Sequence, residues 1–184
     1  AHDLAVRAAT LPFSDSRMDG GKDVACLQSL IGEAGTGKSF CVDGIITTLI
    51  EQHQFTPRKY LKMATTGKAA TIFQGTTVHS WKQGLGLPCG KQAKYKKLGK
   101  QTLQHMQNQF LELRVLFVDE FSMLRQCELH YIDQRLCEIM ADDSLFSSVT
   151  VVLSGDPAQL LAVGGKCVWD KESLILEDLT GFGL

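Results

Sequence analysis

The sequence has almost no net charge and no long apolar run. Its 19 Lys and Arg residues nearly balance 20 Asp and Glu, so the formal net charge of −1 shows no overall bias toward polyanions. No apolar stretch approaches the ~20 residues that a membrane-spanning helix needs, and no signal peptide is visible, so we expect no contact with a membrane. Repeats and low-complexity tracts are also missing. The 44% of hydrophobic residues can form a sizeable core.

The six cysteines are spread singly along the chain and never fall at C-x-x-C spacing. Zinc sites and redox motifs use closely spaced cysteines, so neither is indicated. A reducing compartment is the simplest interpretation, and we therefore expect an intracellular protein.

The strongest positive signal is a phosphate-binding loop, GEAGTGKS, at Gly32–Ser39. In this pattern glycines let backbone N–H groups turn inward around phosphate oxygens. We expect Lys38 to reach the β- and γ-phosphates of ATP and the Ser39 hydroxyl to ligate Mg²⁺. A following helix would direct its positive N-terminal end at the same phosphates. The residues predicted to bind the nucleotide are Gly32, Ala34, Gly35, Thr36, Gly37, Lys38, Ser39 and Phe40.

Two carboxylates follow the apolar run Val115–Val118. Such a run is typical of a central parallel strand, and ligands collect at the carboxyl ends of these strands. Asp119 is therefore the candidate Mg²⁺ ligand, and Glu120 the candidate for orienting and polarising the attacking water. A solvated acidic turn is the alternative. A further strand-like stretch leads into Gly155–Gln159, where the Gln159 amide can hydrogen-bond a γ-phosphate, which makes Lys38, Asp119, Glu120 and Gln159 the candidate catalytic set.

Strand-like and helix-like patterns alternate along the chain. Strands are predicted at Cys26–Ile31, Lys59–Thr65, Arg114–Val118 and Ser148–Ser154, with Leu174–Leu179 as a further candidate. Helices are predicted at Lys38–Gln52, Lys68–Phe73, Leu103–Leu113 and Glu128–Ala141. This alternation predicts an α/β fold, with a parallel sheet, right-handed crossovers and helices on both faces.

The order GxxGxGKS, DExSM and GDxxQ resembles superfamily-one helicases. Two stretches, Met63–Trp81 and Ile132–Ile139, are similar to segments of 5′-to-3′ DNA helicases of the petite-integration-frequency (PIF) family and their RecD relatives. The resemblance covers about Cys26 to Trp169. It implies a RecA-like P-loop NTPase and an ATP-dependent helicase for single-stranded DNA and duplex junctions. It also implies work in DNA repair, recombination and telomere maintenance, in the nucleus or mitochondrion of a eukaryote or the cytoplasm of a bacterium.

Residue by residue, the resemblance implies that Thr66, Gly67 and Lys68 contact the single-strand backbone. It also implies that His79, Ser80 and Trp81 lie along the same path. The Trp81 indole can stack on an unpaired base or pack in the core, and the sequence leaves both open.

Residues 82–104 contain six lysines and no acidic residue, and their glycines favour a loop leading out of the core. At this position the family has a wedge that splits the duplex. A DNA contact of this kind would weaken as salt rises. A solvated, flexible loop is the alternative.

Two family features are missing. Leu161-Ala162 stands where the family has Pro-Pro, and no adenine-reading glutamine motif is recognisable over residues 13–30, where Gln28 is the candidate. The length fits one RecA-like domain, residues 26–184, after a linker or peripheral segment, residues 1–25. The family uses two such domains, and the second supplies an arginine finger.

We therefore expect the second domain in the same full-length chain, and poor ATP hydrolysis by this chain alone. A non-catalytic nucleic-acid-binding remnant of a helicase and another P-loop ATPase are the alternative functions.

Overall fold

The computed structural model describes residues 27–90 and 94–168. They contain a five-stranded sheet in the order β1-β5-β4-β2-β3, and every neighbouring pair is parallel. The strands are β1 (Leu27–Ile31), β2 (Tyr60–Ala64), β3 (Thr76–Thr77), β4 (Val115–Asp119) and β5 (Thr150–Gly155). This arrangement confirms the predicted α/β fold.

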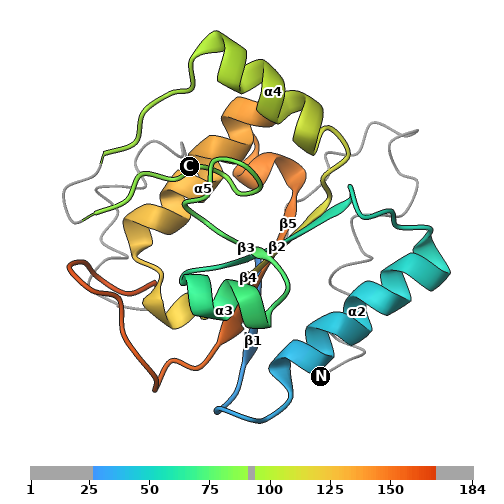
Figure 1. Ribbon diagram of the computed structural model, residues 1–184, viewed down its shortest axis with the longest axis vertical. Helices are drawn as coiled ribbons and strands as arrows, with labels where there is room; N and C mark the ends of the chain where they lie inside the picture. The colour runs from blue at the N-terminus through green and yellow to red at the C-terminus, as the bar shows by residue number, and fades with distance from the viewer. Residues whose placement is uncertain (1–26, 91–93, 169–184) are drawn as a thin grey trace.

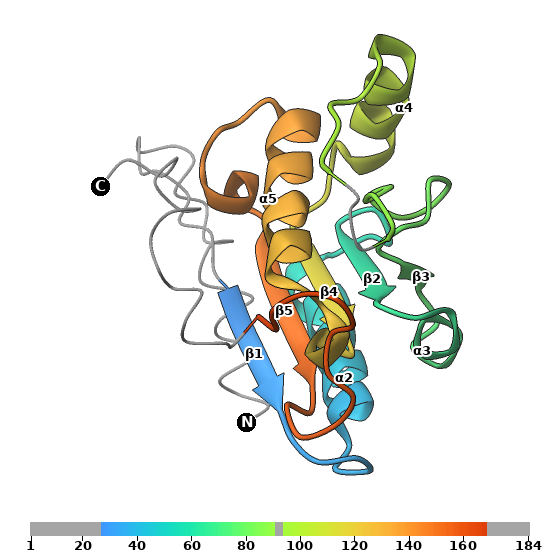
Figure 2. The same ribbon diagram turned by 90° about the vertical axis from the view of Figure 1, so that its left-hand side faces the viewer.

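Helices lie on both faces of the sheet, as the sequence predicts (Figures 1 and 2). Helix α2 covers one face, and α4 and α5 cover the other. The helices are α2 (Lys38–His53), α3 (Gly67–Ile72), α4 (Lys100–Phe110) and α5 (Gln126–Met140), with short 3-10 turns η3 (Phe121–Met123) and η4 (Leu145–Ser148). None of the helices in the described ranges is long and apolar enough to cross a membrane.

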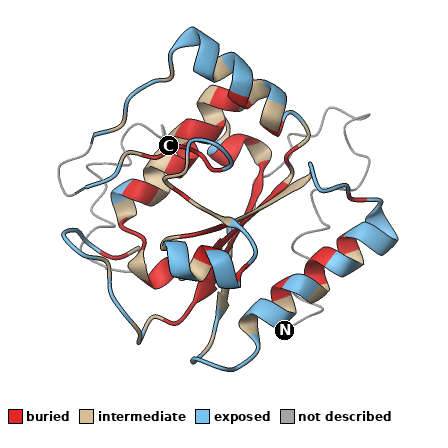
Figure 3. Cartoon of the chain, in the orientation of Figure 1, coloured by how far each residue is buried: buried red, intermediate tan, exposed pale blue. Residues whose placement is uncertain are grey.

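Strand β4 shows why the central run of the sequence is continuously apolar. Its side chains alternate between two clusters: Val115 and Phe117 pack on the α2 side, and Leu116 and Val118 on the α5 side. All four are fully buried. Figure 3 shows this buried layer between the exposed outer surfaces of the helices.

Several boundaries and burial patterns differ from the prediction. Helix α4 begins at Lys100, three residues before the predicted start, because Gly99 takes the extended N-cap position. Strand β3 has only two residues and was not predicted. In α2, the buried residues Val42, Ile45, Ile46 and Leu49 face the sheet, whereas Phe40 and Ile50 are 85% and 42% exposed.

The glycine-rich start of the basic segment, residues 82–104, was predicted to lead out of the core, and this prediction was wrong. Gly84–Leu87 is a loop, but it is buried, with Leu85 and Leu87 in the same cluster as Met106 and Ile132. The predicted strand Leu174–Leu179 and the N-terminal segment of residues 1–25 lie outside the described residues.

Candidate nucleotide and nucleic-acid site

The predicted motifs meet at one edge of the sheet. Because all five strands run in the same direction, their carboxyl ends share that edge, with Ile31 opposite Gly155 and Ala64 opposite Asp119. The three phosphate motifs follow β1, β4 and β5, and the predicted DNA-contact segments follow β2 and β3. This is the edge at which parallel α/β sheets bind ligands.

The phosphate-binding loop connects β1 to α2. Gly35 and Gly37 have left-handed backbones with φ of +78° and +84°. A Cβ at either would meet no atom within 4 Å, so glycine is required there by backbone conformation rather than by space. The Lys38 ammonium folds over the loop and donates hydrogen bonds to the carbonyls of Gly32 (2.7 Å) and Glu33 (2.8 Å). Ser39, at the start of α2, is exposed beside it.

The carboxylates after β4 are held by their neighbours. Asp119 Oδ1 accepts a hydrogen bond of 2.5 Å from the Ser154 hydroxyl on β5. Glu120 has a left-handed backbone, with φ of +54°, and its carbonyl accepts from the Thr65 hydroxyl at 3.1 Å. Burial raises the pKa of the Glu120 carboxyl, the charges of Asp119 and Asp156 raise it further, and Lys38 opposes them. A raised pKa makes Glu120 a stronger base than a free glutamate.

The third motif forms a closed turn around Asp156, which is 7% exposed. Its carboxylate accepts from the Ala158 N–H at 2.9 Å and from the Gln159 side-chain amide at 3.2 Å. Gln159 therefore already donates to a protein carboxylate, and a bond to a γ-phosphate would replace that contact. Leu160, Leu161 and Val163, which follow this turn, are all more than half exposed.

The oxygen donors at this edge suit a hard divalent cation. The hydroxyl of Ser39 and the carboxylate of Asp119 are ligand types that Mg²⁺ prefers. In the described part of the chain, no three His, Cys, Asp or Glu side chains form a metal-binding group.

The first predicted DNA-contact segment begins helix α3. The Thr66 hydroxyl accepts from the Ala69 N–H at 3.2 Å and so caps the helix. Gly67 and Lys68 are exposed at the start of the helix. Thr66 thus has a structural role in the chain, and Gly67 and Lys68 are open to a ligand.

The second segment follows β3 and is held by its own backbone. Ser80 donates its N–H to the carbonyl of Thr77 at 3.0 Å, and its carbonyl accepts from the Gly86 N–H at 3.0 Å. The Nδ1 atom of His79 lies 3.2 Å from the carbonyl oxygen of Leu87, and its Nε2 lies 3.7 Å from Glu128 Oε1. The His79 side chain is 26% exposed, so it connects this segment to its neighbours more than it faces solvent.

Trp81 combines the two roles that the sequence left open. Its ring packs on the backbone of Gly86, where an added Cβ would lie 2.4 Å from a ring carbon. The Arg135 guanidinium carbon lies 6.0 Å from the ring centroid. Nevertheless, 57% of Trp81 is exposed. The indole is therefore fixed by packing and still presents an open surface.

The basic segment is fastened to α5 and borders a groove of about 630 Å³. Tyr95 points inward: its hydroxyl donates to Glu138, and the guanidinium of Arg135 lies 4.7 Å from its ring centroid. The groove is lined by Trp81 and Arg135, together with lysines that are themselves exposed, Lys94, Lys96 and Lys97. Lys91 lies outside the described residues.

Sequence reasoning missed several residues that shape this edge. Ser154 and Asp156 lie in or beside the third motif, and their polar side chains at a strand end were a usable signal. Arg125, Glu128, Arg135 and Glu138 had no such signal, because charged residues in an amphipathic helix are usually solvated.

Three comparisons bear on this site. The family described as PIF1-like helicase matches residues 25–174. The ATP-dependent DNA helicase Pif1 of Psychrobacter sp. (strain PRwf-1) is 31% identical over 139 residues, which cover 74% of this chain and 20% of that protein.

Among solved structures, Bacteroides sp. Pif1 in complex with ADP-AlF4 has a TM-score of 0.61 and 27% identity over 96% of this chain and 35% of that one. Bacteroides Pif1 bound to ssDNA has a TM-score of 0.53 and 27% identity over 85% of this chain and 33% of that one. The chain thus spans about a fifth of the length of the first relative and about a third of the solved chains.

Proposed function

This chain belongs to the PIF1-like helicase family, and on that premise we propose that residues 26–184 are the first RecA-like motor domain of an ATP-dependent DNA helicase that moves 5′ to 3′ along single-stranded DNA and opens duplex junctions. The observation that carries the proposal is the shared carboxyl edge, where the phosphate motifs and the DNA-contact segments lie on adjacent strands. They are joined by the hydrogen bond from the Thr65 hydroxyl to the Glu120 carbonyl.

In this proposal the loop Gly32–Phe40, which includes Ala34 and Thr36, holds the phosphates of ATP. Lys38 exchanges its two carbonyl acceptors for phosphate oxygens. Ser39 and Asp119 would hold a magnesium ion, which would supply positive charge beside the transferring phosphoryl group. Glu120 orients and polarises the attacking water, and its raised pKa suits a base. Gln159 leaves Asp156 to contact the γ-phosphate, and so reports whether that phosphate is present.

The single strand would cross the β2–β3 end of the same edge. Gly67 and Lys68 are exposed to meet the backbone, and Trp81 offers a fixed aromatic surface for an unpaired base. The lysines beside the groove extend this path toward the duplex junction, which fits a wedge role for residues 82–104. Binding that depends on these lysines should weaken as salt concentration rises.

We further propose that a second RecA-like domain of the full-length protein completes the ATP site with an arginine finger, which is typically worth about 10³ to 10⁵ in rate. The share of the relatives' length that this chain spans supports the proposal. Such a protein would act where cellular DNA lies, in the nucleus or mitochondrion of a eukaryote or the cytoplasm of a bacterium.

The test is ATP hydrolysis by the full-length protein with and without single-stranded DNA, followed by unwinding of forked duplexes that carry a 5′ or a 3′ tail. We expect DNA to stimulate turnover, Lys38→Ala to abolish it, and only the 5′-tailed fork to be opened. ATP hydrolysis that single-stranded DNA does not stimulate would indicate another P-loop ATPase. Salt-sensitive DNA binding without any turnover would indicate a non-catalytic remnant.

A further inference from the structure

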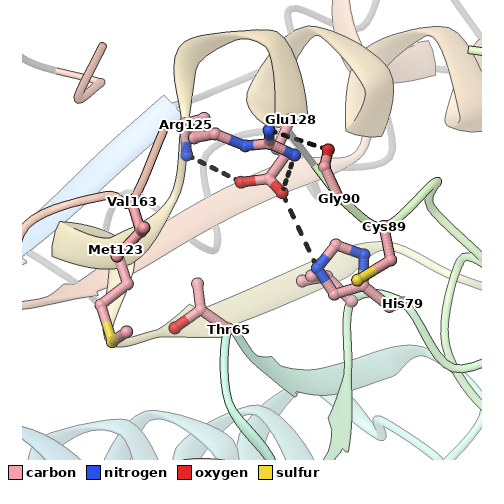
Figure 4. A pocket seen from close by; sticks show the side chains of 9 residues that line it. Thr65, His79, Cys89, Gly90, Met123, Arg125, Glu128 and Val163 are labelled. Carbon is pink, nitrogen blue, oxygen red and sulfur yellow. Dashed lines mark hydrogen bonds and ion pairs between the residues drawn. The ribbon is translucent and has the colours of Figure 1, made fainter. Parts of the chain in front are cut away.

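A buried ion pair lies between the two halves of the site. Arg125 is the N-cap residue of α5, and Glu128 is three residues further on. Glu128 accepts from the Arg125 backbone N–H at 2.8 Å and from its guanidinium Nη2 at 2.7 Å. Both side chains are only 8% exposed. Figure 4 shows the pair at the rim of a pocket of about 200 Å³, facing His79 and Cys89.

The pair contacts the DNA-contact side through two further interactions. Glu128 Oε1 lies 3.7 Å from Nε2 of His79, and Arg125 Nη1 donates to the carbonyl of Gly90 at 3.1 Å. The distance to His79 is longer than a formed hydrogen bond, so this contact can tighten or release with a small movement. The pair therefore touches the segment His79–Gly90 at both of its ends.

The same residues are joined to the nucleotide side through the backbone. Asp119 and Glu120 precede Arg125 by only the short turn η3 and one buried residue, Leu124. The chain that follows the third motif returns to this point: Arg125 forms an antiparallel bridge with Cys167, and the Gln126 N–H donates to the carbonyl of Lys166 at 3.1 Å.

The arginine stem packs closely in this arrangement. A Cβ added at Gly165 would lie 2.8 Å from Arg125 Cδ. The segment Gly165–Cys167, which follows the third motif, is therefore in direct contact with Arg125, and Arg125 is joined to Glu128 by two hydrogen bonds.

We propose that Arg125 and Glu128 are positioning residues that couple the nucleotide-binding edge to the DNA-contact segment His79–Gly90. The inference rests on the proposed function. In it, a change at Glu120 or Gln159 on nucleotide binding moves the start of α5, and the ion pair transmits that movement to His79 and to the carbonyl of Gly90. Neither residue touches nucleotide or DNA. Closely packed elements such as this buried pair favour two discrete arrangements over a gradual deformation.

The experiment measures the coupling as a ratio of affinities in the full-length protein. The dissociation constant for a fluorescein-labelled single-stranded oligonucleotide is determined by anisotropy with and without a non-hydrolysable ATP analogue and Mg²⁺. Affinity for the analogue alone is determined with a fluorescent derivative. Two variants perturb the pair. Glu128→Gln replaces the carboxylate by a neutral amide and so removes its charge, and Arg125→Lys replaces the planar guanidinium by an ammonium, which cannot form the same two hydrogen bonds. Glu112→Gln is the matched control, since it breaks the exposed ion pair with Arg58.

Coupling between two sites typically changes affinity by about 5- to 150-fold. We expect the wild type and Glu112→Gln to share one ratio, and Glu128→Gln to reduce it to about 1, with each separate affinity within about threefold of the wild type. Arg125→Lys should lower the ratio in the same direction. An unchanged ratio in both variants of the pair, or a wild-type ratio of 1, would overturn the proposal.

A joint fall of both affinities and of the melting temperature in both variants would show that the pair only holds the fold, and would also overturn it. A wild type that binds neither oligonucleotide nor analogue would instead refute the proposed function itself.

Discussion

Glu138 joins the basic segment to α5, and its removal should cost much of the stability of the domain. Its carboxylate accepts from the Tyr95 hydroxyl (2.5 Å), the Leu98 N–H (2.6 Å) and the Arg135 guanidinium (2.9 Å). Arg135 is 1% exposed, and it also donates a hydrogen bond of 3.2 Å to the carbonyl of Lys96. Glu138→Ala therefore leaves a buried guanidinium without its counter-charge.

The magnitude follows from the burial of Arg135. Removal of one partner of a buried ion pair costs about 3 to 5 kcal/mol. For a protein of this size, each kcal/mol lowers the melting temperature by about 2 to 4 °C, so Glu138→Ala should lower it by about 6 to 20 °C. The double replacement of Arg135→Met with Glu138→Leu removes both charges and should recover at least half of the loss, because an apolar pair of similar volume needs no counter-charge.

The assay is urea and thermal unfolding of the wild type, the single variant and the double variant. Glu112→Ala is the control, because it removes the partner of Arg58 in an ion pair whose side chains are 41% and 76% exposed. That change should stay within about 1 kcal/mol. A Glu138→Ala protein that loses less than about 1 kcal/mol, or a double variant no more stable than Glu138→Ala, would refute the reasoning.

Three further predictions concern the ATP site and the loop beneath Trp81. Glu120→Gln should lower the rate of DNA-stimulated ATP hydrolysis by a factor of about 10² to 10⁴, with nucleotide affinity retained. The rate is measured by phosphate release, and unimpaired turnover would exclude Glu120 as the base. Burial, and then the charge of Asp119, raises the pKa of the Glu120 carboxyl from its ordinary value of 4.5. Because a base acts in its deprotonated form, wild-type turnover should fall as the pH decreases, with a midpoint above that ordinary value. A midpoint at or below it would contradict the assignment. Gly86→Ala should cost about 2 to 4 kcal/mol in urea unfolding, since its φ is +60° and the new methyl group would meet the Trp81 ring. The control Gly99→Ala, with open space around it, should cost less than about 1 kcal/mol, and equal losses would count against the packing argument.

The sequence by itself determined the parts of this protein that depend on local spacing. A strand, a glycine turn and a helix N-terminus follow one another within about twenty residues, so the phosphate loop at Gly32–Ser39 could be located without a structure. The apolar run before Asp119 likewise predicted a doubly covered strand, which β4 confirms. Parallel strands share a carboxyl edge, so the motifs were expected at one edge of the sheet, and they lie there.

The tertiary structure alone decided which charged side chains are buried and what they hold. Glu128 and Glu138 look like ordinary solvated helix residues in the sequence. Glu138 nevertheless accepts hydrogen bonds from Tyr95 and Leu98, which lie 43 and 40 residues away in the chain, and Glu128 Oε1 lies 3.7 Å from His79 Nε2. No local pattern encodes these contacts. The same holds for Gly84–Leu87, which lies in the core although its glycines favour an exposed loop, and for the short strand β3, which exists only because β2 offers it an edge. Local propensity sets which elements form, whereas burial is a property of the assembled layers.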